Sequence, residues 1–150
     1  MSFEEKLTWV STFVTIVVTA VYAWTVAGQM AGTPVAEIVY QVPMIVAVGS
    51  IVAMTIVGSI LMSIGAAISD QITGEGSLKE IDRKDERDVN INRRGELIGY
   101  YVLSVGALGV LALAMMRFDP FWIANALFLS LMLAGTASSV AKLVVYRRGY

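Results

Sequence analysis

The sequence contains no cysteine and no histidine in 150 residues. Without cysteine there is no disulfide framework, no thiol nucleophile and no thiolate metal site. Without histidine the chain lacks the commonest general base and the commonest ligand of transition metals. These two absences argue against haem, zinc or copper chemistry, and we expect neither a metal site nor a cofactor.

Charge is also scarce, since charged residues make up 15% of the chain and hydrophobic residues 57%. A soluble domain usually carries about 25% charged residues. The charges leave four uncharged stretches of 30, 32, 20 and 22 residues: 7–36, 38–69, 97–116 and 120–141. A bilayer core needs roughly 20 apolar residues per helix, so each stretch is long enough to span it.

The sequence therefore predicts an all-α integral membrane protein with a single domain, 1–150. Four transmembrane helices are expected at about 7–27, 42–68, 96–116 and 120–146, arranged as two antiparallel hairpins. A soluble helical bundle is disfavoured, because its helices would show a polar face at every turn. The net charge of −1 gives no reason to expect direct binding of nucleic acid.

Lysine and arginine predict the orientation of these spans. If both termini are cytoplasmic, ten basic residues lie inside and only Arg117 lies outside. The positive-inside rule therefore favours cytoplasmic N and C termini. The arginines near that surface are also expected to contact anionic lipid headgroups.

The segment of about 70–95 holds a dense run of alternating acids and bases, KEIDRKDERD at 79–88. No proline interrupts 75–116, so we expect the third helix to extend from the membrane into the cytoplasm. One interpretation is a solvated helix with i,i+4 ion pairs and no site. A second is a docking surface for a protein partner, since a fixed charge pattern sets specificity. A calcium loop is disfavoured by the spacing and by the interleaved basic residues.

Local signals mark helix starts and helix contacts. Thr33 before Pro34, and Asp119 before Pro120, each have the pattern of an N-cap followed by proline at the first helical position. Small residues recur at helical spacing, which allows helices to approach closely in lipid and makes a homo-oligomer, most simply a dimer, reasonable. The candidate packing positions are Gly49, Ala53, Ser59, Ser63, Gly135 and Ser139.

Polar residues inside the spans are few. Glu96 and Lys142 lie near the cytoplasmic ends of neighbouring antiparallel helices, where an ion pair between them is plausible. Asn125 is expected to form a hydrogen bond across helices rather than to line a pathway. The hydroxyls of Thr12, Thr15 and Thr19 are expected to bond to their own helix more than to line a pore.

Three stretches of the chain resemble a family of small bacterial four-helix membrane proteins of unknown function. They are KDERDVNINRRGELIG (84–99), FDPFWIANALFL (118–129) and SSVAKLVVYRRGY (138–150). The resemblance implies a location in a bacterial inner membrane. In that family the genes often lie beside those of helix-turn-helix regulators, which implies a sensory or regulatory membrane partner. The motif residues shared with the family are Asp85, Glu86, Arg87, Asp88, Arg94, Gly95, Glu96, Asn125, Lys142, Arg147 and Arg148.

We expect no enzymatic activity, because the chain has no phosphate-binding glycine loop and no nucleophile paired with a base. The leading hypothesis is a regulatory or sensory membrane protein that docks a protein partner through its charged segment. The alternatives are a small oligomeric transporter or channel, and an accessory subunit of a larger membrane complex. The residues expected to contact a partner or lipid are Asp85, Glu86, Arg87, Asp88, Arg93, Arg94, Arg147 and Arg148.

Overall fold

A computed structural model of the chain describes residues 3–73 and 86–148. Its elements are α1 (Phe3–Met30), the short 3-10 helix η1 (Val35–Glu37), α2 (Gln41–Thr73), α4 (Glu86–Met115) and α5 (Pro120–Arg148). In the described residues each of the four α-helices is long and apolar enough to cross a membrane. The all-α, multi-pass membrane fold predicted from the sequence is thus confirmed.

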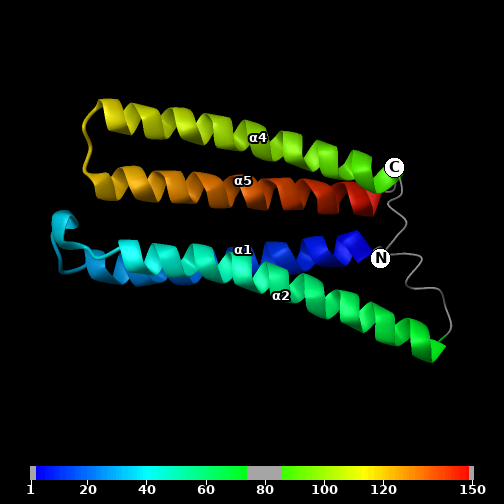
Figure 1. The fold of residues 1–150 in the computed structure, drawn as a ribbon. Helices are drawn as coiled ribbons and strands as arrows, with labels where there is room; N and C mark the ends of the chain where they lie inside the picture. Colours follow the sequence, from blue (N-terminus) through cyan, green and yellow to red (C-terminus); the bar gives the residue numbers. More distant parts are fainter. Residues whose placement is uncertain (1–2, 74–85, 149–150) are drawn as a thin grey trace.

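The helices lie side by side in the order α4, α5, α1, α2 (Figure 1). Extensive contacts join α4 to α5, α5 to α1 and α1 to α2. Both chain termini lie at the same end of the molecule (Figure 1). We call this the charged end, formed by residues 3–6, 86–94 and 142–148, and the opposite end, with residues 31–40 and 116–119, the hairpin end.

The buried core lies toward the hairpin end and joins α1, α2 and α5. Tyr22 packs against Phe128 with ring centroids 4.5 Å apart, and Tyr40 packs against Phe121 at 5.3 Å. Ala47 of α2 belongs to the same buried cluster. Because aromatic rings bury large apolar areas and favour tilted contacts, this cluster is the main packing centre of α1 with α5.

Helix α4 packs on α5 in a different way, through glycines. A side-chain carbon at Gly95 would lie 2.9 Å from the carbonyl oxygen of Ser138, and one at Gly99 would lie 3.0 Å from Cβ of Ser138. One at Gly106 would lie 2.6 Å from Cβ of Ser130. Small residues on both helices therefore let the backbones approach closely, as is usual for helix pairs in lipid.

The connection between α4 and α5 is short and well capped. Arg117 has a left-handed φ of 58°. The Phe118 N–H donates to Leu113 O at 3.1 Å, and the Arg117 N–H donates to Ala114 O at 3.0 Å, as in a Schellman motif. Asp119 then caps α5, because its Oδ1 accepts a hydrogen bond from the Phe121 N–H at 2.8 Å, which confirms the predicted start signal.

The prediction for the α1–α2 connection was wrong in detail. Pro34, not Thr33, holds the cap position of η1, and no side chain caps it. The loop is instead fastened by the Gln29 side chain, which accepts from Val39 N–H at 3.1 Å and donates to Val39 O at 3.3 Å. Pro43 lies in the first turn of α2, where a missing N–H costs no helical hydrogen bond.

The helices extend beyond their expected membrane spans, most of all α4 (Glu86–Met115), which includes ten residues before the span expected at 96–116. Residues 86–95 are therefore helical and continuous with the membrane span, as the lack of proline indicated. The 30 residues of α4 correspond to about 45 Å, longer than a hydrocarbon core of about 30 Å. The preceding residues, 74–85, lie outside the part of the chain that the structure describes.

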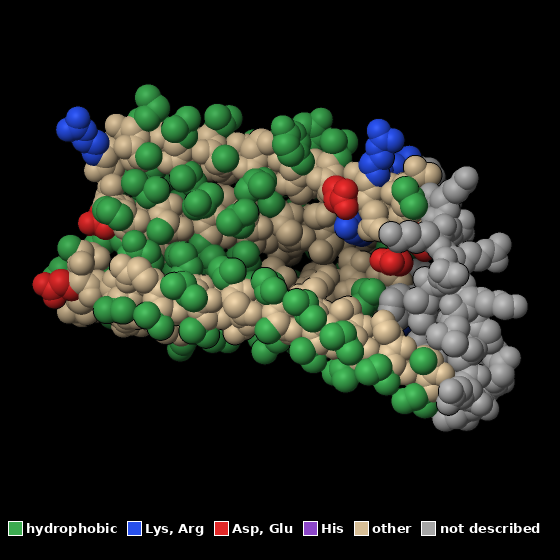
Figure 2. All heavy atoms as spheres, viewed as in Figure 1, with side chains coloured by type: hydrophobic (Ala, Val, Ile, Leu, Met, Phe, Trp, Pro, Cys, Tyr) green, Lys and Arg blue, Asp and Glu red, His purple; other side chains and the backbone are tan. Residues whose placement is uncertain are grey.

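The visible surface separates charge from hydrophobic side chains. Figure 2 shows acidic and basic side chains at the two ends, with a broad hydrophobic region between them. Large hydrophobic side chains exposed within the spans include Val105 at 72% and Ile45 at 71% exposure. In water such a surface would drive aggregation, whereas in a bilayer it is the surface that contacts lipid.

Candidate interaction site at the charged end

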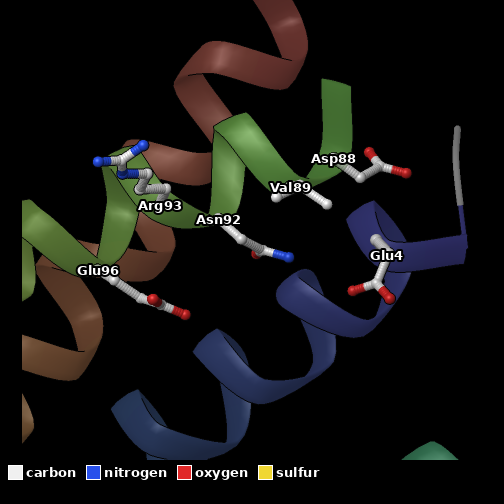
Figure 3. Close-up of a pocket in the computed structure, with 6 residues that line it drawn as sticks. All are labelled: Glu4, Asp88, Val89, Asn92, Arg93 and Glu96. Atoms are coloured by element: carbon white, nitrogen blue, oxygen red, sulfur yellow. The ribbon is translucent and has the colours of Figure 1, made fainter. Parts of the chain in front are cut away.

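A cavity of about 280 Å³ lies between α1 and α4 at the charged end. Its α4 wall follows helical periodicity, because residues spaced by three or four positions share one face of a helix. Glu4 of α1 completes the lining of the cavity. The lining residues are Glu4, Asp88, Val89, Asn92, Arg93 and Glu96 (Figure 3).

Helix α5 holds the walls of this cavity in place. The Tyr146 hydroxyl donates a hydrogen bond of 2.9 Å to Oδ1 of Asp88, which fixes the first turn of α4. One residue further on, the Arg147 guanidinium lies 5.5 Å from the ring centroid of Trp9 on α1. A cation–π contact of this kind contributes about 0.5–1 kcal/mol at exposed sites. The C-terminal turns of α5 thus contact both helices that line the cavity.

Carboxylates dominate the cavity. Glu4 and Glu96 direct their carboxylates toward the space between α1 and α4, with Asn92 between them (Figure 3). The Arg93 guanidinium extends to the side of α4 away from α1 (Figure 3). This arrangement favours a cationic group in the cavity. In the described part of the chain no three acidic side chains come close enough together to hold a metal ion.

The residues predicted to contact a partner or lipid divide into three groups. Asp85 lies outside the described residues, and Glu86 and Arg87 are described only as the first backbone turn of α4. Asp88 and Arg93 line the cavity. Arg94, Arg147 and Arg148 are exposed at the charged end, and Arg147 stacks on Trp9.

The predicted ion pair between Glu96 and Lys142 is not formed, because the two side chains take different directions. A side-chain carbon at Gly95 would lie 2.7 Å from Cε of Lys142, so the aliphatic stem of Lys142 runs across that glycine. Glu96 is the next residue, about 100° further around the helix, and lines the cavity toward α1.

Asn125 does make a contact between helices, at a distance from the charged end. Its Oδ1 accepts a hydrogen bond of 2.7 Å from the Tyr22 hydroxyl of α1, and its Nδ2 donates to Phe121 O at 2.8 Å. Thr12 is buried, and its hydroxyl donates to Thr8 O at 2.6 Å. Asn125 and Thr12 are thus used within the protein rather than presented to a channel. For Thr19 the expectation was wrong, because its buried hydroxyl has no hydrogen-bond partner among the described residues.

The predicted packing positions lie mostly on outward faces of the single chain. Gly49, Ala53, Ser63 and Gly135 are exposed, whereas Ser59 and Ser139 are partly buried. A side-chain carbon at Gly49 or Gly135 would meet no atom within 4 Å. These positions remain candidates for contact between copies of the chain.

Sequence reasoning missed the residues that complete the site. Glu4 and Asn92 carried no signal in the sequence, because only the tertiary structure brings residues of α1 and α4 to one cavity. The glycines of α4 did carry a signal in the sequence, because GELIG at 95–99 is a GxxxG motif. The segment SSVAK at 138–142, which packs against it, contains Ser138.

Comparison of the chain with models of protein families, with curated proteins and with solved structures gives no match.

Proposed function

We propose that this chain is a non-enzymatic protein of a bacterial inner membrane, with cytoplasmic termini, that acts as a regulatory or sensory partner. It docks a protein at the charged end, and the docking surface is the acidic cavity between α1 and α4. The lining carboxylates favour a partner segment that carries lysine or arginine.

One observation supports this proposal above the others: the charged residues 86–96 belong to the same helix as a membrane span. That helix is packed against α5 at Gly95 and Gly99 and bonded to it at Asp88. A partner that binds at Asp88 and Glu96 therefore contacts a rigid unit that continues into the bilayer. Such a unit transmits a displacement between membrane and cytosol better than a tethered loop does.

Charge complementarity supports a protein partner over a solvated helix end. Opposite charges across an interface steer encounter and exclude partners of the wrong charge. Glu4 comes from a different helix than Asp88 and Glu96, so the acidic lining is assembled by folding. It is not the alternating charge pattern of one exposed helix.

The test places a photo-crosslinking residue at Val89, which lines the cavity and is 52% exposed. Irradiation of native membranes should capture one heterologous protein, identified by mass spectrometry. The same residue at Met116, exposed at the hairpin end, is the control and should not capture it.

Charge reversal makes the test specific. The double substitution Glu4→Lys with Glu96→Lys should abolish capture at Val89, whereas Glu37→Lys at the hairpin end should leave it unchanged. In the Glu4→Lys, Glu96→Lys variant, a change of a basic residue of the captured protein to an acidic one should then restore capture at Val89. If Val89 captures only lipid and second copies of the chain, the docking proposal is wrong, and solute flux in liposomes becomes the next measurement.

A further inference from the structure

The last turn of α5 holds both helices that line the acidic cavity, through two neighbouring residues. Tyr146 donates a hydrogen bond of 2.9 Å to Oδ1 of Asp88 on α4. The Arg147 guanidinium lies 5.5 Å from the ring centroid of Trp9 on α1. In the described part of the chain, extensive contacts join α5 to α1 and α5 to α4, but not α1 to α4. The distance between the two walls of the cavity is therefore set by α5.

The two walls are not held equally firmly. Next to Asp88, α4 is also packed on α5 through Gly95 and Gly99. The buried cluster that joins α1 to α5 contains Tyr22, which lies 13 residues beyond Trp9, or about 20 Å along the helix. Thr12 is buried between them, but its hydroxyl bonds within α1. At the cavity, α1 is thus held to α5 less firmly than α4 is.

The contact between Arg147 and Trp9 lies where lipid headgroups reach it. Arg147 is exposed, and Trp9 is 40% exposed near the first end of the candidate span Glu4–Met30. Tryptophan prefers the headgroup level of a bilayer. Among the described residues Arg147 forms no ion pair with a carboxylate, so its guanidinium has donors for the oxygens of a phosphate.

Two partners of similar strength then compete for one guanidinium. A cation–π contact at an exposed site and the attraction of one arginine to an anionic leaflet are of comparable size. Because neither interaction dominates, the content of anionic lipid decides which partner Arg147 takes. A ligand that binds one of two such states shifts the population toward that state.

We propose that the Arg147–Trp9 contact is a clasp that anionic phospholipid opens, and that this clasp regulates the acidic cavity. In a neutral leaflet Arg147 stays on Trp9, and Glu4 is held near Asp88 and Glu96. In an anionic leaflet the guanidinium binds a lipid phosphate, and the first turns of α1 move away from α4. The three carboxylates then lie further apart and bind a basic partner segment more weakly. The effect on a partner rests on the proposed docking function, whereas the movement of α1 does not.

The absence of cysteine allows a direct test on the full chain. Spin labels are attached at Lys6→Cys on α1 and Asn90→Cys on α4, both at exposed positions. The labelled protein is reconstituted into vesicles of phosphatidylcholine, with or without phosphatidylglycerol. Double electron–electron resonance then measures the distance between the labels. We expect a longer mean distance and a broader distribution when phosphatidylglycerol is present.

Variants of the clasp make the measurement specific. Arg147→Ala removes the cation, and Trp9→Leu removes the aromatic face but keeps an apolar side chain. Both variants should give the long, broad distribution in either kind of vesicle. Arg147→Lys keeps the charge and should retain the response to phosphatidylglycerol. Arg148→Ala, at the next exposed position, is the matched control and should respond as the original chain does.

Three results would overturn the proposal. They are equal distances in both kinds of vesicle, a response to phosphatidylglycerol that persists in Arg147→Ala, and the same response to inorganic phosphate added to phosphatidylcholine vesicles. The last would identify a soluble anion, not the membrane, as the trigger. The distances are measured without a partner, so capture at Val89 and the opening of the clasp fail independently.

Discussion

The two hairpins of this protein are built from similar lengths of apolar helix, but they pack very differently. Helices α4 and α5 approach closely at Gly95, Gly99 and Gly106. Helices α1 and α2 leave a groove of about 540 Å³, and the far part of α2 diverges from the other helices (Figure 1). Figure 2 also shows the surface hollowed between α2 and the α4–α5 pair.

The difference shows what holds helices together in lipid. A valine on a helix gains little by leaving lipid for another helix, since both surroundings are apolar. Close backbone approach and hydrogen bonds between helices remain as the sources of stability. Helices α4 and α5 have three glycines in close contact, whereas in α2 a side-chain carbon would meet α1 only at Gly58, 3.2 Å from Cγ1 of Val10, and nothing within 4 Å at Gly49 or Gly65. The groove and the diverging helix follow from that distribution.

The loops that connect the helices of each hairpin differ in the same way as the helix packing does. The α4–α5 connection is the four residues 116–119, closed by a Schellman motif and an N-cap. The α1–α2 connection is the ten residues 31–40, fastened by the side chain of Gln29. The first makes one rigid unit of its helices, and the second allows α1 and α2 to separate.

The largest effect is expected from Gly99→Leu, which places a side chain against Cβ of Ser138 and the carbonyl oxygen of Ala134. Overpacking of this kind costs about 1–3 kcal/mol. The thermal midpoint of the purified protein in detergent should fall clearly. Gly135→Leu is the matched control, because nothing lies within 4 Å of it, and its midpoint should match that of the original chain. Equal losses in both variants would contradict the packing described for α4 and α5.

A gain in stability is expected from Arg117→Gly. Arg117 has a φ of 58°, and the left-handed conformation costs an ordinary residue roughly 1 kcal/mol relative to glycine. The same thermal measurement should show a higher midpoint. In the other connection no positive φ requires Gly32, so Gly32→Ala should not destabilise the protein. If Arg117→Gly lowers the midpoint, the arginine contributes more than the turn geometry accounts for.

The smallest effect is expected where the two hairpins meet, at the bond between Tyr22 and Asn125. A double-mutant cycle with Tyr22→Phe and Asn125→Ala should give a coupling free energy of about 0.6 kcal/mol, with about 1.7 kcal/mol as the upper end for such bonds in membranes. Thr25→Val, which breaks only a bond within α1, combined with Asn125→Ala, should show no coupling. A coupling of zero for Tyr22 and Asn125 would mean that the aromatic cluster and the Arg147–Trp9 contact join α1 to α5 without help from this bond.

Particular residues show how far the sequence determines the candidate site. Asp88 and Arg93 were predicted as contact residues, and both line the cavity. Glu4, which lines the same cavity, is 84 positions from Asp88 and 89 from Arg93, and nothing in the sequence pairs it with them. Glu96 and Lys142 were expected to pair because opposite charges lay at matching depths, but depth does not fix the direction of a side chain. The contact of Lys142 with Gly95 arises only when two helices pack.

The sequence by itself determined that this chain crosses a membrane four times, where the helices lie, and that α4 extends past its span without a break. These are consequences of composition along the chain, because a helix that spans lipid must be long and apolar and carry few charges. The tertiary structure alone decided the order α4, α5, α1, α2, the close α4–α5 pair, the open α1–α2 groove and the acidic cavity. The reason is that no hydrophobic driving force acts between helices in lipid. Local differences in shape and hydrogen bonding therefore determine which helices pack together.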